Sequence, residues 1–173
     1  VELDPLSSMA HGAYGMRLRV NHRYDEAIAE WQKALGLNPS APVMHHNLAI
    51  TYHLKGMDQQ AFAEAKAQAV EIEHDAETAA ALDGGYAQGG FREAMRRAAE
   101  IRVARSRRMY VPPSRIAELY ALAGDKDRVL AWLRKSLDQH ELTAMNLRVP
   151  VWDFLRFDPG FQEIFQRRMK PQQ

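Results

Sequence analysis

The chain has 173 residues and a formal net charge of +1, from 23 lysines and arginines against 22 aspartates and glutamates. This balance gives no electrostatic reason to expect nucleic acid, an anionic membrane or an acidic partner. The absence of cysteine excludes a disulfide framework, a zinc–thiolate site and a cysteine nucleophile. An apolar fraction of 46% excludes a disordered chain, and no apolar run approaches the length of a membrane span.

The composition favours helices. There are 26 alanines, but only 18 valines, isoleucines and threonines together, and alanine is the best helix former. Apolar residues recur at the helical spacing, for example at Ala27, Ile28, Trp31, Ala34 and Leu35, and no segment alternates as a strand does. The sequence therefore predicts an all-α fold.

An internal period of about 34 residues runs along the chain. Pro5 and Pro39 are one such period apart, as are Leu18 and Tyr52. The period predicts helix pairs over about 8–41, 42–75, 76–109 and 110–141, after a partial repeat at 1–7. Because residues 1–5 look like the last turn of an earlier repeat, we expect the chain to be a piece of a longer protein.

The four predicted pairs differ in regularity. The first has the full pattern of small and large apolar residues, whereas the second departs from it at Ala65, Gln68 and Glu73. The third is irregular, with a predicted turn at Gly89–Gly90, and the fourth turns at Gly124–Asp125. The positions that match the repeat pattern are Tyr14, Gly15, Leu18, Ala27, Trp31, Ala34 and Pro39, then Leu48, Ala49, Tyr52 and Ala61, then Leu82, Tyr86 and Ala94, and finally Ile116, Ala117, Tyr120, Val129 and Leu133.

This pattern resembles the tetratricopeptide repeat family. The resemblance implies a right-handed α–α superhelix of about four helix pairs, in which small residues allow close helix approach and large residues fill the gaps. It also implies a protein–protein interaction scaffold that binds a protein or peptide in a concave groove. The family's groove-facing positions, transferred to this chain, fall on Met16, Arg19, His46, Asn47, Ile50, His53, Arg115 and Glu118.

Residues 142–173 are predicted to form a cap of one or two short helices. Asp158–Pro159 is a typical helix start, and the segment is rich in apolar side chains that a solenoid end needs as cover. The alternative is a mobile tail whose aromatic residues dock a partner. The segment resembles the closing D-x-L-R-x-D-P-x-F-Q stretch of bacterial regulators that carry winged-helix, kinase or cyclase domains. The matching residues are Asp153, Leu155, Arg156, Asp158, Pro159, Phe161 and Gln162.

The sequence contains no recognisable catalytic or phosphate-binding motif. We therefore expect no enzyme activity, no cofactor and no metal site. The seven histidines lack the spacing of ligand pairs on one helix face, since His46 and His53 are two turns apart. Seven arginines between Arg92 and Arg108 form a basic segment. We interpret it as a solvated face with ion pairs to the acidic turn near Glu73, with docking of an acidic protein or nucleic acid as less favoured alternatives.

Several functions remain open at this stage. The favoured one is the sensor or interaction region of a larger bacterial signalling or transcription regulator. The alternatives are an oligomerisation module that packs on itself or on an upstream effector domain, and a sensor of a small ligand in the groove. The expected location is cytoplasmic, or else the periplasmic part of a membrane-anchored regulator.

Overall fold

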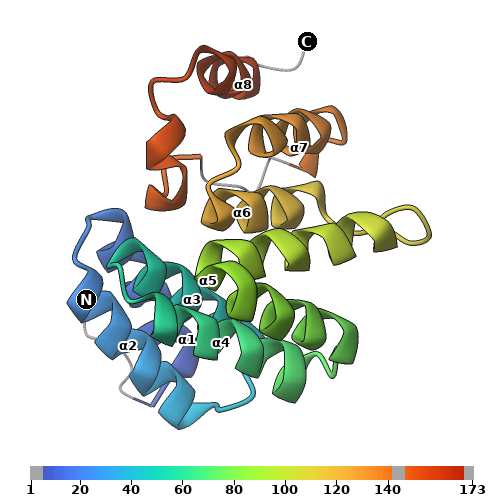
Figure 1. The fold of residues 1–173 in the computed structure, drawn as a ribbon. Coiled ribbons are helices and arrows are strands. Elements are labelled where there is room, and N and C mark those ends of the chain that lie inside the picture. Colours follow the sequence, from blue (N-terminus) through green and yellow to red (C-terminus); the bar gives the residue numbers. More distant parts are fainter. Residues whose placement is uncertain (1–5, 142–146, 170–173) are drawn as a thin grey trace.

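The computed structural model describes residues 6–141 and 147–169, and these ranges contain helices and turns but no strand. Antiparallel helices follow one another as hairpins, and the chain ends in a short helical segment above them (Figure 1). This confirms the predicted all-α repeat solenoid. The element bounds are α1 Ser8–Val20, α2 Tyr24–Leu37, α3 Pro42–Leu54, α4 Asp58–Ala67, η1 Gln68–Ile72, α5 Ala76–Arg105, α6 Pro113–Ala123, α7 Lys126–Asp138, η3 Pro150–Leu155 and α8 Pro159–Met169.

The first hairpin, α1 and α2, is the most regular. Ser7 caps α1 by accepting from the Ala10 amide, and the side chain of Trp31 is completely buried between the two helices. Its indole Nε1 donates to the Gly12 carbonyl at 3.1 Å. Tyr14 was predicted to fill a gap between helices but is partly exposed. Within the described residues, no helix precedes α1 and packs against this end of the stack.

The second hairpin, α3 and α4, ends differently from the first. Pro42 stands at the start of α3, where its missing N–H costs no hydrogen bond. The last turn of α4 widens into a π-helix, η1, over Gln68–Ile72. The sequence does not predict this widening, and π turns are rare and frequently found at functional sites.

The third hairpin lies within α5. The helical path breaks at Gly89 and Gly90, and Gly90 has a φ of +69°, which a residue with a Cβ rarely adopts. The two halves are pressed together at Gly85, where an added Cβ would stand 2.6 Å from the Ala94 Cα. The predicted turn at Gly89–Gly90 is confirmed.

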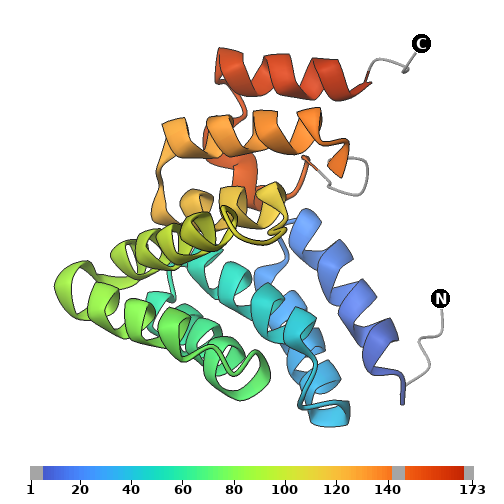
Figure 2. The ribbon, with the colours of Figure 1, turned by 90° about the vertical axis from the view of Figure 1, so that its right-hand side faces the viewer.

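The fourth hairpin, α6 and α7, carries the C-terminal segment. Gly124 ends α6 in the left-handed conformation and Asp125 caps α7. Helix α8 packs on α7, whereas η3 packs against α6 and also reaches α3 (Figure 2). Asp158 caps α8, as predicted, by accepting from the amides of Gly160 and Phe161.

The apolar residues of the C-terminal segment divide into two groups. Phe154 and Phe157, which belong to the apolar residues of the predicted cap, are 51% and 93% exposed. Phe154 lies in η3 and Phe157 in the turn between η3 and α8. The group buried against α6 and α7 comprises Leu147, Val151, Trp152, Leu155, Phe161 and Ile164. The partial repeat at 1–5 and the cap residues 142–146 and 170–173 lie outside the described residues.

The basic segment is largely neutralised by ion pairs. Arg102 Nη2 lies 2.8 Å from Glu73 Oε2, and Arg105 forms a two-point ion pair with Asp75 across the hairpin. Arg96 pairs with Glu93 and Glu100 on its own helix. These pairs confirm the predicted contact with the acidic turn near Glu73.

Candidate functional site

Three of the predicted groove residues meet across the concave side of the stack. His46 lies on α3, and Arg115 and Glu118 lie on α6, 69 and 72 positions further along the chain. Arg115 Nη1 lies 2.7 Å from His46 Nε2 and 3.0 Å from Glu118 Oε2. His46 Nε2 is also 3.3 Å from the same carboxylate oxygen. The cluster therefore links the first helix of the second repeat directly to the first helix of the fourth.

Glu118 remains ionised within this cluster. Burial raises the pKa of its carboxyl, but the hydrogen bonds with His46 and Arg115 and the charge of Arg115 outweigh that effect and hold the pKa at about 2. His46 has two roles open to it, as an acceptor from Arg115 or as a donor to Glu118. Either role leaves the carboxylate with a cationic neighbour.

Arg19 supplies a second positive charge from α1. It is 4% exposed, and its guanidinium lies over the Trp31 ring at 5.2 Å from the centroid. Nη2 donates to the sulfur of Met16 at 3.1 Å, whereas the buried Nε and Nη1 have no hydrogen-bond partner in the described part of the chain. Burial lowers the pKa of Arg19 to about 10, partly offset by the charge of Glu118. The concave side therefore carries two arginines, the buried Arg19 and the exposed Arg115, beside the carboxylate of Glu118.

The other predicted groove residues are less available to a partner. Asn47 and Ile50 are 4% and 2% exposed, and Met16 is partly covered by core packing. His53 is half-buried, its Nδ1 lies 2.7 Å from Asp58 Oδ1, and its ring stacks on Phe91 with centroids 4.7 Å apart. In this conformation His46, Arg115 and Glu118 come together, and the remaining predicted residues are dispersed around them.

A repeated histidine–carboxylate pair was not predicted from the sequence. His11 Nδ1 lies 2.6 Å from Glu30 Oε2, and His45 Nδ1 lies 2.7 Å from Glu64 Oε2. The two histidines are one repeat period apart, and so are the two glutamates, so each pair joins the two helices of its own repeat at the same position. The recurrence of a histidine and a glutamate one repeat period apart is therefore the sequence signal that could have predicted these pairs.

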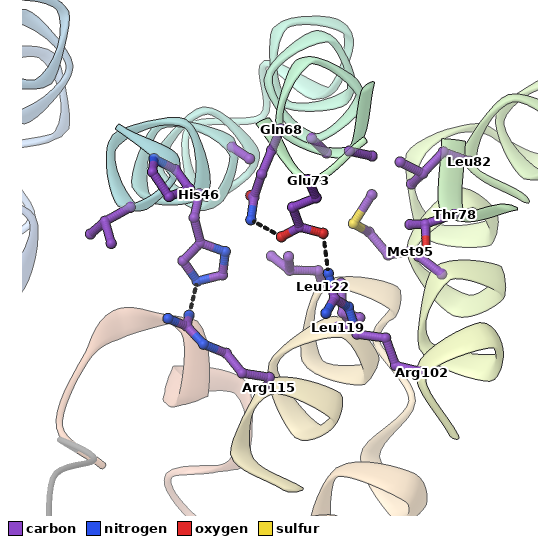
Figure 3. Close-up of a pocket in the computed structure, with 16 residues that line it drawn as sticks. His46, Gln68, Glu73, Thr78, Leu82, Met95, Arg102, Arg115, Leu119 and Leu122 are labelled. Atoms are coloured by element: carbon purple, nitrogen blue, oxygen red, sulfur yellow. Dashed lines mark hydrogen bonds and ion pairs between the residues drawn. The ribbon is translucent and has the colours of Figure 1, made fainter. Parts of the chain in front are cut away.

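A cavity of about 280 Å³ lies beside the cluster, between α3, η1, α5 and α6. Figure 3 shows His46, Glu73 and Arg102 reaching into this space from three sides. Its walls include the small side chains of Ala49, Ala65, Ala69 and Ala98. No group of three or more histidine, aspartate or glutamate side chains with metal-site geometry occurs among residues 6–141 and 147–169.

Comparison with protein families finds a match for the repeat pattern. The model described as TPR repeat matches residues 20–56, which span α2 and α3. The chain contains a tetratricopeptide repeat. The hairpins on either side extend the same helix-pair architecture, which makes the described structure a tetratricopeptide-like solenoid. Comparison with curated proteins gives no match.

Tetratricopeptide repeats generally mediate protein–protein interaction, and their fold is a non-catalytic one. Among the helices of the described residues, none is both long and apolar enough to cross a membrane. The side chains of His46, Arg115 and Glu118 can take part in recognition by charge and hydrogen bonding.

Proposed function

We propose that the chain is a protein-interaction scaffold that binds a peptide or protein segment on its concave side. The observation that carries this proposal is the excess of cationic groups there, since the buried Arg19 and the exposed Arg115 share one carboxylate, Glu118. An unpaired buried charge is costly, so a partner that brings an acceptor is favoured. A segment with an acidic side chain supplies one.

An acidic partner would have to displace the Glu118 carboxylate from His46 and Arg115. This carboxylate already engages His46 across the groove and Arg115 on its own helix, so an incoming carboxylate would compete for the same donors. The interaction surface then consists of His46 and Arg115, while His53 flanks it. Arg19 is 4% exposed and joins this surface only if the groove widens on binding. Asn47 and Ile50 belong to it only if the groove widens on binding.

Peptide selection from a random display library tests the proposal. We expect selected peptides to be enriched in aspartate and glutamate, and Arg115→Ala to weaken their binding at least about tenfold in fluorescence anisotropy. Arg23→Ala is the matched control, because Arg23 is exposed and pairs with Glu26 on its own helix rather than across the groove. Equal binding to Arg115→Ala at an unchanged melting temperature would place the site elsewhere.

An oligomerisation role is the second candidate. It is favoured by exposed apolar side chains at both ends of the stack: Met9 and Tyr14 on α1, and Phe154 and Phe157 beside α8. Light scattering during gel filtration over a wide concentration range tests it. A mass equal to that of one chain, 19.7 kDa, at every concentration would remove this candidate.

The wider setting is also proposed. The repeat array would occupy residues 1–141 and the cap 142–173, as the sequence predicts. The role within a bacterial signalling or transcription regulator, and the cytoplasmic location, rest on the resemblance of the C-terminal segment. The sequence upstream of residue 1 in the gene would test them by showing whether an effector domain precedes the array.

A further inference from the structure

The cavity between α3, η1, α5 and α6 coincides with the places where the second repeat departs from its own pattern. Ala65 stands one repeat period after Trp31, and Gln68 and Glu73 stand one period after Ala34 and Pro39. All three of these departures line the cavity. Trp31 fills the corresponding space of the first repeat completely, whereas Ala65 leaves it open. The cavity therefore results from specific substitutions in the repeat.

The lining is suited to a small amphipathic molecule. Apolar side chains from several elements, such as Leu82, Met95 and Leu122, form most of the wall, with the alanines that leave the space open. The volume of about 280 Å³ lies just below the range of roughly 300–1,000 Å³ that is usual for ligand pockets. A compact apolar body of fragment size is the shape that such a cavity accepts.

The polar groups of the cavity leave donors unused. Glu73 is the acidic residue among those that line it in the described chain, and both of its oxygens are taken. Gln68 Nε2 donates to Oε1 at 2.8 Å, and Arg102 Nη2 donates to Oε2 at 2.8 Å. The remaining guanidinium donors of Arg102 have no acceptor in residues 6–141 and 147–169. Arg115 adds a further cation beside His46, as Figure 3 shows.

We propose that this cavity is a binding site for a small organic acid with a compact apolar body and one carboxylate. The apolar body fills the space left by Ala65, and the carboxylate accepts from Arg102, with Arg115 as the second cationic neighbour. Charge-assisted hydrogen bonds to a guanidinium are stronger than neutral ones, so the acid binds better than its neutral amide. The η1 turn places Gln68 and Glu73 at this site, because the widened backbone carries both toward α5.

Binding of 4-fluorobenzoate, followed by fluorine NMR, tests the proposal. A molecule of this size in such a site is expected to bind with a Kd of about 0.1–1 mM. The neutral 4-fluorobenzamide is expected to bind at least about tenfold more weakly. Absence of saturable acid binding up to about 10 mM would overturn the site, and equal binding of acid and amide would overturn the carboxylate specificity.

Substitutions that fill the cavity with a larger side chain test whether the acid binds there. Ala65→Phe restores the aromatic residue of the repeat pattern and is expected to abolish binding while the melting temperature stays the same or rises. Ala98→Leu fills the same space from α5 and serves as a second variant if Ala65→Phe misfolds. Gln60→Phe is the control, because it adds the same ring to an exposed position of α4. Binding that survives a folded filling variant would place the ligand elsewhere and overturn the proposal.

Glu73→Gln separates recognition from a purely structural role. The change removes the carboxylate that competes for Arg102, so the acid is expected to bind about three- to tenfold more tightly while the amide is unaffected. The double variant Glu73→Gln with Arg102→Met is expected to lose the preference for the acid. Weaker acid binding to Glu73→Gln, or a preference retained by the double variant, would overturn the role of Arg102.

Discussion

Gly15 lies directly against the indole of Trp31: an added Cβ at position 15 would stand 2.8 Å from both Cε2 and Nε1 of the ring. The pair holds α1 and α2 at close range, and Trp31 adds a hydrogen bond to the Gly12 carbonyl. A small residue on one helix and the largest residue on the other thus define the first repeat.

Replacing Trp31 with alanine is expected to lower the free energy of unfolding by about 3–5 kcal/mol, because a large cavity forms in a fully buried position. Urea denaturation measures it. Trp132→Ala is the control, since Trp132 is only half-buried on α7, and its loss should be clearly smaller. A Trp31→Ala loss below about 1 kcal/mol would contradict the core position.

Replacing Gly85 with alanine is expected to destabilise the chain by about 1–3 kcal/mol, because the methyl group would overlap the backbone of Ala94. Gly36→Ala is the matched control. Gly36 also lies in a helix, but an added Cβ there meets no atom within 4 Å, so that change should stabilise by about 0.5–1 kcal/mol. Thermal unfolding measures both changes. A lower melting temperature for Gly85→Ala together with a higher one for Gly36→Ala would confirm the contact, whereas shifts in the same direction would contradict it.

Acid should weaken the junction between the second and third repeats. The hydrogen bonds from Arg105, together with the Thr78 cap, hold the pKa of Asp75 well below its usual value despite partial burial. A lowered carboxyl pKa stabilises the fold above the unfolded value of about 3.9, and this contribution declines as the pH falls below it.

Asp75→Asn should therefore cost about 1–3 kcal/mol at pH 7, where the ion pair is intact in the parent chain. The difference between the two proteins should narrow between about pH 5 and pH 2. Chemical denaturation at a series of pH values measures it. A difference that stays constant over this range would show that the charge of Asp75 does not contribute.

The C-terminal segment offers a pair of substitutions with opposite expectations. Leu155→Ala should destabilise by about 2–5 kcal/mol, because Leu155 is fully buried beside α6. Phe157→Ala should change stability by no more than about 0.5 kcal/mol, because the side chain is almost wholly in solvent. If Leu155→Ala is also neutral, the segment does not act as a cap.

The fold could be predicted well because its signals are local. Gly89–Gly90, Gly124 and Asp158 break or begin helices through backbone conformation and capping, which depend on a few neighbouring residues. The burial of Trp31 follows from the repeat period. The η1 turn was missed because a widened helix turn carries no distinct residue pattern.

The site could be predicted only in part. The family positions identify His46, Arg115 and Glu118, but not that they contact each other, since a contact between positions so far apart in the chain depends on how far the stack curves. Curvature sums small rotations at every helix interface. It also decides the burial of Asn47 and Ile50, which the sequence places in the groove and the structure places in the core.

The contact between His46 and Arg115 also bears on how the chain unfolds. In a linear repeat array each unit is coupled only to its neighbours, so one end can unravel while the other persists. Here α3 touches α6 past the third repeat, and η3 reaches both of these helices. These contacts between elements that are not neighbours in the chain couple the second, third and fourth repeats to the C-terminal segment. These parts are expected to unfold in a single cooperative step, and the first repeat, α1 and α2, is the part that can unfold separately.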